Sequence, residues 1–332
     1  MAGPKERFIV GGLALDAEGK TLFAAGTWGH GVRIVPLSDP EKPRKVELPT
    51  DSYPYTCLPA KDGKRLFVSL WAGEGVAVID LGTDKVAATW KTELHPTEMA
   101  LSPDGSTLYV ACANSTKVAV LDSATGKALE TIHCALYPAS PSGNTPSSLC
   151  LTPDGKMLFV ANSDANNLSV FNVADRGKSK PLGFIPVGWY PTSVRFNAKD
   201  KRIYVANGKG ITSRANPQGP GPYRRPGLMT LYQYIGAILQ GTLGIIDLPT
   251  PEKMADYSKQ AYACCPLKRD FSPRTGGWTE GNPVPPKQGG RSPIKHCIYI
   301  IKENRTYDQV FGDIKEGTVS YTHLTLPTNR EV

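Results

Sequence analysis

The stretch LSPDGSTLYVAC, from Leu101 to Cys112, decides the fold because the chain contains it in five variants. Each copy has a polar turn that contains Gly or, in the fifth copy, Asp, followed by a run rich in β-branched, aromatic and other apolar residues. Proline presets the φ angle of such a turn and glycine accepts a positive φ, so each copy predicts a β-hairpin. The copies are LDAEGKTLFAAG at Leu15, PAKDGKRLFVSL at Pro59, LSPDGSTLYVAC at Leu101, LTPDGKMLFVAN at Leu151 and FNAKDKRIYVAN at Phe196.

The spacing of the five turns predicts a repeat of sheets. The turn residues Gly19, Gly63, Gly105, Gly155 and Asp200 are 44, 42, 50 and 45 residues apart. A second hairpin follows within a unit, as in KVAVLDS and KALETIH, which gives four antiparallel strands. One such sheet cannot bury both of its faces, so adjacent sheets must stack, as the blades of a β-propeller do. The expected blades are 8–50, 52–92, 95–134, 145–187 and 190–250.

Composition and charge narrow the class of protein. The chain has 332 residues, of which 40% are hydrophobic and 20% charged, and its 33 glycines and 29 prolines favour many short strands. The net charge of +8 is concentrated in residues 196–226 and 260–305. We find no nucleic-acid reader motif beside these charges, so no nucleic-acid partner is expected. Two interpretations stay open: solvated basic loops, or attraction of an anionic, phosphorylated substrate.

The cysteines and the apolar segments point to no special chemistry. Seven cysteines show neither a C-x-x-C pair nor zinc-ligand spacing, and Cys57, Cys112 and Cys150 lie in strand-like runs, where a thiol behaves as a small core residue. Met1 is followed by AGPKERF, so no secretory signal is visible. The most apolar window, which begins at Gly227, is interrupted by glutamines and glycines, and we expect no membrane span.

A residue followed by proline opens four of the expected blades. The pairs are Tyr53-Pro54, His95-Pro96, Thr145-Pro146 and Tyr190-Pro191. A ring of such residues could line a central opening and bind a ligand. Alternatively, proline fixes the path of the chain into the inner strand. A single histidine in this ring does not predict a metal site.

The fifth unit departs from the repeat. About thirty residues, within an expected insertion at 208–240, separate IYVANGKG from GTLGIIDL, and loops of that length in a compact domain are usually functional or docking elements. The segment PTPEKMADYSKQAYA then predicts a helix with Thr250 as N-cap and Pro251 at the first helical position. We expect this helix to replace the outermost strand of the fifth blade.

Phrases such as SPDGSTLYVACANSTKVAVLD and TPDGKMLFVANSDANNLSVFNV resemble the YVTN-type β-propeller family, over roughly residues 8–250. The resemblance implies an all-β, WD40-like propeller that usually has seven blades. The five blades expected here therefore imply that further blades precede Met1. Residues 1–250 form the expected propeller domain, and residues 251–292 the expected helix and Pro/Gly-rich linker.

The segment IKHCIYIIKENRTYDQVFGD, from Ile294 to Asp313, differs from everything before it. CIYII predicts a short buried strand, and polar residues follow at its carboxyl end, where open α/β sheets place catalytic groups. The segment resembles the opening strand of the phosphoesterase branch of the alkaline-phosphatase superfamily. That resemblance implies that Glu303 and Asn304 help to bind a catalytic divalent metal, with Arg305 and Asp308 as local supports. Carboxylate and amide oxygens are suitable hard ligands.

The combination of propeller and ENRTYD phrase resembles bifunctional bacterial proteins in which a hydrolase domain continues for several hundred residues. We expect residues 293–319 to be the start of a truncated α/β phosphoesterase domain. The tail SYTHLTLPTNREV, residues 320–332, resembles translated adapter sequence and is expected to be non-native. The nucleophile and the other metal ligands would lie beyond it, so no catalytic residue is assigned within the chain. The fragment is expected to be inactive and to hold no metal by itself.

Three functions therefore follow from the sequence. The first is a metal-dependent phosphoesterase with an attached propeller, acting on a phosphoester substrate; the resemblance implies an exported, periplasmic or extracellular protein. The second is a non-enzymatic propeller that binds a protein or cell-surface ligand. The third is a propeller enzyme such as a sugar lactonase, which would require an acidic cluster at the channel mouth that the repeats do not display.

Overall fold

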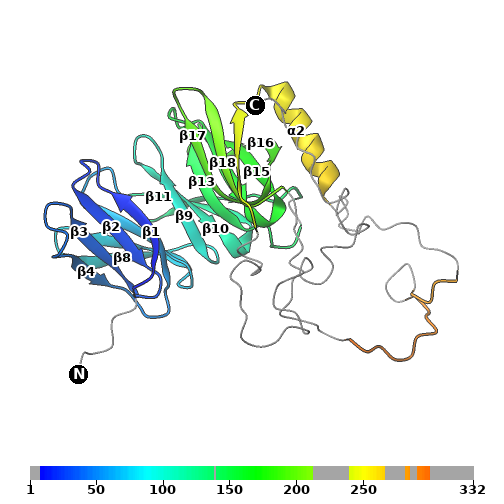
Figure 1. The fold of residues 1–332 in the computed structure, drawn as a ribbon, viewed down its shortest axis with the longest axis horizontal. Coiled ribbons are helices and arrows are strands. Elements are labelled where there is room, and N and C mark those ends of the chain that lie inside the picture. Colours follow the sequence, from blue (N-terminus) through cyan, green and yellow to red (C-terminus); the bar gives the residue numbers. More distant parts are fainter. Residues whose placement is uncertain (1–7, 138–139, 212–238, 266–280, 285–289, 300–332) are drawn as a thin grey trace. The chain divides into compact units, whose positions relative to one another are not determined.

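The described residues of the computed structural model are 8–137, 140–211, 239–265, 281–284 and 290–299. They form five antiparallel sheets that succeed one another in chain order, with one α-helix (Figure 1). All strands belong to one compact unit, within residues 1–211 and 240–262. The predicted all-β propeller class is confirmed.

Each sheet is a meander in which successive strands pair in order. The first contains β1 (Val10–Leu15), β2 (Thr21–Gly26), β3 (Gly31–Pro36) and β4 (Arg44–Glu47). The second contains β5 (Pro54–Pro59), β6 (Arg65–Leu70), β7 (Gly75–Asp80) and β8 (Lys85–Lys91). The third contains β9 (Pro96–Leu101), β10 (Thr107–Cys112), β11 (Lys117–Asp122) and β12 (Ala128–His133), with the short 3-10 helix η1 (Ala113–Ser115). The fourth contains β13 (Pro146–Leu151), β14 (Met157–Asn162), β15 (Asn167–Asn172) and β16 (Lys180–Pro186), with η2 (Ser163–Ala165). The fifth contains β17 (Trp189–Asn197), β18 (Arg202–Gly210) and β19 (Thr242–Asp247).

The repeated turn closes as its sequence predicts. In the third sheet Gly105 has φ +75°, a left-handed value that side chains rarely adopt. The Asp104 carboxylate accepts hydrogen bonds from the Ser102 hydroxyl at 2.5 Å and from the Ser106 amide at 3.1 Å. Since these contacts are local, the short motif is sufficient to specify the hairpin without help from the rest of the chain.

Stacking of neighbouring sheets builds the core. Alternate residues of one strand face opposite neighbours: Leu66 and Val68 on β6 pack with the first sheet, whereas Phe67 packs with the third. All three side chains are fully buried. Similar apolar clusters fill the spaces between the third and fourth and between the fourth and fifth sheets. Burial of both faces explains why the strands are almost continuously apolar rather than alternating.

The two ends of the described stack expose apolar side chains. On β1, Leu13 and Leu15 are 58% and 51% exposed, and on β19 Leu243 and Ile245 are 62% and 55% exposed. Inside the stack, the positions equivalent to Leu13, Leu243 and Ile245 are buried, as Met99, Val118 and Val120 show in the third sheet. Each end therefore presents the kind of surface that stacking buries elsewhere in the described sheets.

The helix α2 (Pro251–Cys264) follows β19, where the other sheets have their fourth strand. Thr250 caps it, as predicted, since its hydroxyl accepts a hydrogen bond from the Lys253 amide at 3.3 Å. The helix docks against the fourth sheet: the Ser258 hydroxyl accepts the Phe184 amide of β16 at 2.9 Å, and Met254 is buried. The sequence predicted the helix but not this docking surface.

Some predicted features lie outside the described residues. They include residues 212–238 of the insertion and residues 300–332, with the ENRTYD phrase and the tail. Of the predicted strand CIYII, residues 297–299 are described and have no regular secondary structure. The phosphoesterase domain therefore stays a prediction. Among the described residues, no helix has the length and apolar character needed to cross a bilayer.

Candidate functional site in the central channel

The first strand of each sheet lies beside the first strand of the next, in the order β1, β5, β9, β13 and β17. These inner strands border a cavity of about 720 Å³, which we call the channel. Its walls combine apolar side chains such as Leu58 and Leu149 with the charged side chains of Glu98 and Arg195. A cavity of this size and mixed character is typical of small-molecule sites.

Glu98, Ser148 and Arg195 form a polar cluster in this wall, one from each of three adjacent inner strands. The Arg195 guanidinium donates to both Glu98 carboxylate oxygens, at 2.5 Å to Oε1 and 3.2 Å to Oε2. Oε2 also accepts from the Ser148 hydroxyl and, at 3.1 Å, from the Leu149 amide. Ser148 Oγ in turn accepts the Val194 amide at 3.0 Å. The cluster thereby ties the third, fourth and fifth sheets together.

Glu98 and Arg195 differ in exposure, which sets what each can do. The Glu98 side chain is 23% exposed and its oxygens accept four hydrogen bonds, so it is poorly placed to remove a proton from a substrate. The Arg195 side chain is 58% exposed and can reach an anionic ligand. The geometry therefore favours binding of an anion over general-base chemistry at Glu98.

Burial and charge shift the pKa values of nearby groups. Burial lowers the pKa of Arg195, but Glu98 and, to a smaller extent, Cys150 together raise it above its ordinary value, so the guanidinium stays charged. Burial, with smaller contributions from Glu98 and Tyr190, raises the pKa of Tyr55. Burial also raises the pKa of the Cys150 thiol to about 12, and Arg195 offsets this only in part. Cys150 is therefore a protonated thiol at neutral pH rather than a nucleophile.

Sequence reasoning missed this cluster, although a weak signal exists. Glu98 occupies the repeat position that Thr56 and Ser148 hold in neighbouring blades, and Arg195 occupies the position of Cys150. A charged residue at a position that other blades fill with an uncharged residue is a signal that could have identified Glu98 and Arg195. Their partnership could not have been found this way, because they are 97 residues apart.

The predicted ring of residues before proline has a regular backbone, and none of its four residues lines the channel or the cavity beside β19 and α2. Tyr53, His95, Thr145 and Tyr190 all have left-handed φ angles, between 46° and 57°. Two of the side chains contact the preceding blade: the Tyr53 ring packs edge-on against Trp28, and the His95 ring stacks on Trp71. Thr145 and Tyr190 instead contact Asp164 and Lys209 of their own blades. These contacts favour the interpretation that the residues fix the path of the chain between blades.

The predicted metal ligands Glu303 and Asn304, and their supports Arg305 and Asp308, lie outside the described residues. Within the part of the chain that the structure describes, no group of three or more His, Cys, Asp or Glu side chains is placed to hold a metal ion. The expectation that Cys57, Cys112 and Cys150 serve as core residues holds for Cys57 and Cys112, which are buried free thiols, whereas Cys150 is only partly buried. Cys134, which the sequence did not single out, is buried as well. Burial raises the pKa values of Cys57, Cys112 and Cys134 to about 12, 11 and 12.

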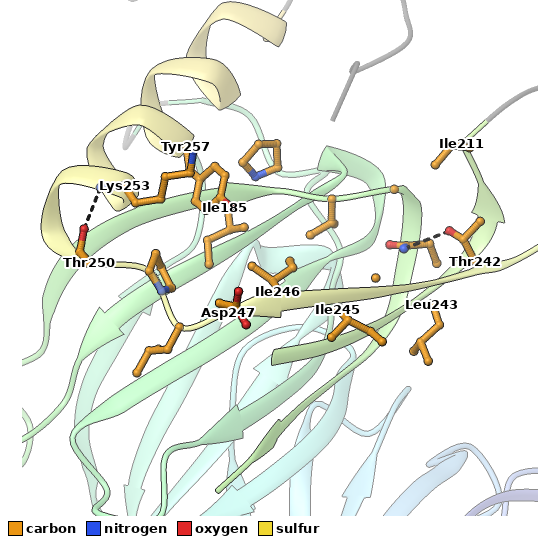
Figure 2. A pocket seen from close by; sticks show the side chains of 17 residues that line it. Ile185, Ile211, Thr242, Leu243, Ile245, Ile246, Asp247, Thr250, Lys253 and Tyr257 are labelled. Carbon is orange, nitrogen blue, oxygen red and sulfur yellow. Dashed lines mark hydrogen bonds between the residues drawn. The ribbon is translucent and has the colours of Figure 1, made fainter. Parts of the chain in front are cut away.

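A second cavity, of about 670 Å³, lies between β19, the chain after β16 and the start of α2 (Figure 2). Ile185, Ile246 and Tyr257 line it, and Asn207 donates to Thr242 at 3.3 Å at one end. Asp247 also lines the cavity, and its Oδ1 accepts a hydrogen bond from Arg202 Nε at 2.8 Å. This cavity gathers few groups with catalytic chemistry, so the channel is the better candidate site.

Comparison with known families agrees with the fold. The family described as "Lactonase, 7-bladed beta-propeller" matches residues 13–212. The chain belongs to this lactonase-type propeller family. The five described sheets thus represent five blades of a fold that the family builds from seven. No curated protein matches the chain.

Solved structures similar to this propeller share its fold at low sequence identity. A protein from Lactobacillus plantarum has a TM-score of 0.52 and 20% identity, over 60% of this chain and 64% of its own length. A "putative 6-phosphogluconolactonase" from Bacteroides fragilis has a TM-score of 0.50 and 18% identity, over 59% and 62%. One from Bacteroides uniformis has a TM-score of 0.52 and 17% identity, over 71% of each chain. The chain therefore spans less than two thirds of the length of the first two structures.

The lactonase-type family match refines the family resemblance that was inferred from the sequence. The YVTN-type resemblance implied the propeller, and the matched family is a propeller family as well, of lactonase type. The match ends at residue 212, well before the ENRTYD phrase, and provides no support for a fused phosphoesterase domain. The match supports the coarser description of a lactonase-type propeller.

Proposed function

We propose that this chain is the substrate-binding propeller of a phosphoester hydrolase whose metal site includes Glu303 and Asn304. The observation that carries the role of the propeller is the state of Glu98, the one carboxylate on the five inner strands. Four hydrogen bonds occupy it, whereas Arg195 beside it is exposed. Such a wall binds an anionic group and leaves the chemistry to residues elsewhere.

The channel suits a phosphorylated ligand. Arginine presents a planar fork of donors that matches phosphate oxygens, and Glu98 and the Val194 carbonyl hold the Arg195 guanidinium in place. The cavity volume of about 720 Å³ accommodates a ligand of sugar-phosphate size. Arg195 would thus position the phosphoryl end of the substrate.

The phosphoester assignment itself depends on the ENRTYD phrase. Its Glu303 and Asn304 offer a carboxylate and an amide oxygen, a donor set that fits a hard divalent cation. The ion would polarise a phosphoryl oxygen when bound. Two side chains are too few to hold a catalytic metal, so further ligands would have to come from chain beyond those described here.

Hydrolysis of p-nitrophenyl phosphate tests this proposal. The protein is expressed with the downstream coding sequence of its gene and assayed with Mn²⁺ or Zn²⁺. We expect Glu303→Ala and Asn304→Ala to lose most of the activity, whereas Glu316→Ala, a nearby acidic residue outside the phrase, retains it. Full activity in the Glu303→Ala/Asn304→Ala double variant would show that the two residues are not metal ligands.

A second candidate, lactone hydrolysis in the channel, is favoured by membership of the lactonase-type family and by the Glu98–Arg195 pair beside the cavity. Proteins of similar fold carry the description 6-phosphogluconolactonase. Hydrolysis of 6-phosphogluconolactone by the chain, lost in Arg195→Ala together with Glu98→Gln, would establish this function instead. Ligand binding without either activity would leave the propeller a binding module.

A further inference from the structure

The loops between the second and third strands of the four complete sheets have the same length but different chemistry. In each sheet the paired strand ends leave four loop residues, namely 27–30, 71–74, 113–116 and 163–166. In the fourth sheet polar bonds close the loop: Thr145 donates to Asp164 at 2.5 Å, and Ser163 Oγ lies 2.7 Å from Ser147 Oγ. The loops of the first and second sheets carry aromatic rings instead.

These rings form two groups that are adjacent along the chain, together called the aromatic row and defined as Trp28, His30, Tyr53, Trp71 and His95. Tyr53 packs edge-on with Trp28 and with His30, at centroid distances of 5.8 and 5.6 Å. Trp71 stacks on His95 at 4.1 Å. The Tyr53 carbonyl accepts the Trp71 amide at 3.0 Å, which joins the two groups of rings. The row thus extends over the first three sheets.

The fold does not require these indoles. At the loop position of Trp28 the third and fourth sheets have Asn114 and Asp164, and at that of Trp71 the third sheet has Ala113. Those sheets keep the same strand register and loop length. Yet Trp28 is 57% exposed and Trp71 38% exposed. Large aromatic side chains that are exposed at positions the repeat fills with small or polar residues indicate a binding surface.

The histidines of the row occupy positions that are not the most favourable for histidine. The Nδ1 atoms of His30 and His95 are buried and have no hydrogen-bond partner among the described atoms. Leaving a buried polar atom unsatisfied costs about 1–3 kcal/mol. His30 and His95 also hold left-handed φ angles of 46° and 54°, where bulky side chains are strained. Asn166 fills the position equivalent to His30 in the fourth sheet, so a residue better suited to this backbone is compatible with the repeat.

We propose that the aromatic row binds the pyranose rings of a neutral oligosaccharide. The exposed parts of Trp28 and Trp71 offer apolar surface for the C–H faces of sugars, and exposed carboxylates lie near the row in sequence, at Asp51 and Glu74. Carboxylates only accept hydrogen bonds at neutral pH, so they suit the hydroxyl donors of a sugar. A proline-rich peptide presents carbonyl acceptors, which these carboxylates repel. The charge pattern therefore favours a glycan over such a peptide.

Isothermal titration calorimetry with maltohexaose, cellohexaose and chitohexaose tests the proposal. We expect at least one of these hexasaccharides to bind, and binding to weaken at least tenfold in Trp28→Asn and in Trp71→Ala. Both substitutions introduce the residue that the third sheet carries at the same loop position, so the fold should persist, which thermal unfolding checks. Leu182→Asn removes an exposed apolar side chain on β16 and should leave binding unchanged.

Three outcomes would overturn the proposal. The first is that none of the three hexasaccharides binds the unaltered protein. The second is that the tryptophan variants, folded, bind as tightly as the parent. The third is that a proline-rich decapeptide binds in a manner that depends on Trp28 and Trp71 while the sugars do not, which would assign the row to peptide recognition.

Discussion

Replacing Glu98 by alanine should destabilise the propeller by removing the acceptor that joins three sheets. Glu98 accepts from Ser148, Leu149 and Arg195. Leu149 is 2% exposed, so its amide would lose its side-chain acceptor in a dry environment, at a cost of about 1–3 kcal/mol. Arg195 is 58% exposed and water can solvate it, so the lost ion pair adds at most about 1 kcal/mol. We expect a total of about 3 kcal/mol.

Glu98→Gln separates the two contributions. Glutamine keeps an oxygen that can accept from Leu149 and Ser148, but it loses the charge that pairs with Arg195 and the acceptor of the Arg195 Nη2 hydrogen bond, both at a half-exposed group, so its cost should be about 1 kcal/mol. For a domain of about 200 residues, 1 kcal/mol lowers the Tm by roughly 2–4 °C. Glu98→Ala should therefore lower the Tm by roughly 6–12 °C, and Glu98→Gln by about 2–4 °C or less.

Thermal unfolding followed by circular dichroism in low and high salt measures both variants. High salt should narrow the difference between the parent and Glu98→Gln, because a half-exposed ion pair is screened. The reasoning fails if Glu98→Ala unfolds within 2 °C of the parent, or if the alanine and glutamine variants are equally unstable. The latter result would mean that charge, rather than the buried amide, dominates the cluster.

Two further changes test the turn and the helix. Hydrogen bonds from Ser102 and Ser106 lower the pKa of Asp104 to about 2. The ionised carboxylate therefore stabilises the folded protein above the ordinary pKa near 4, and this stabilisation is lost as the pH falls from about 4 to 2. Asp104→Asn should reduce the loss of Tm over that pH interval, and a variant whose Tm falls with acid as much as that of the parent would contradict this. Met254 on α2 is 5% exposed and packs with the fourth and fifth sheets. Met254→Ala should therefore lower the free energy of unfolding in urea by about 2–4 kcal/mol, whereas Lys259→Ala, at an exposed position of the same helix, should change it by no more than about 0.5 kcal/mol. Equal stability of the two variants would show that α2 does not support the sheets.

The sequence by itself determined the strands, turns and stacking of this protein. Each hairpin depends on contacts within a few residues, such as Asp104 with Ser102 and Ser106, so a local motif is sufficient to predict it. Continuous apolar runs such as Leu66–Val68 predict that both faces of the sheet are buried, and a neighbouring sheet on each side provides that burial. The cap of α2 at Thr250 was equally local.

Only the tertiary structure decided which distant side chains meet. Glu98, Ser148 and Arg195 lie 47 to 97 residues apart and come together because three inner strands stack around one channel. The same holds for α2, whose Ser258 meets Phe184 across 74 residues, and for Tyr53, which packs against Trp28 of the preceding sheet. Hydrophobic periodicity sets which face of a strand is buried, but it carries no information on the partner that buries it. That partner depends on the order and angle in which the sheets stack.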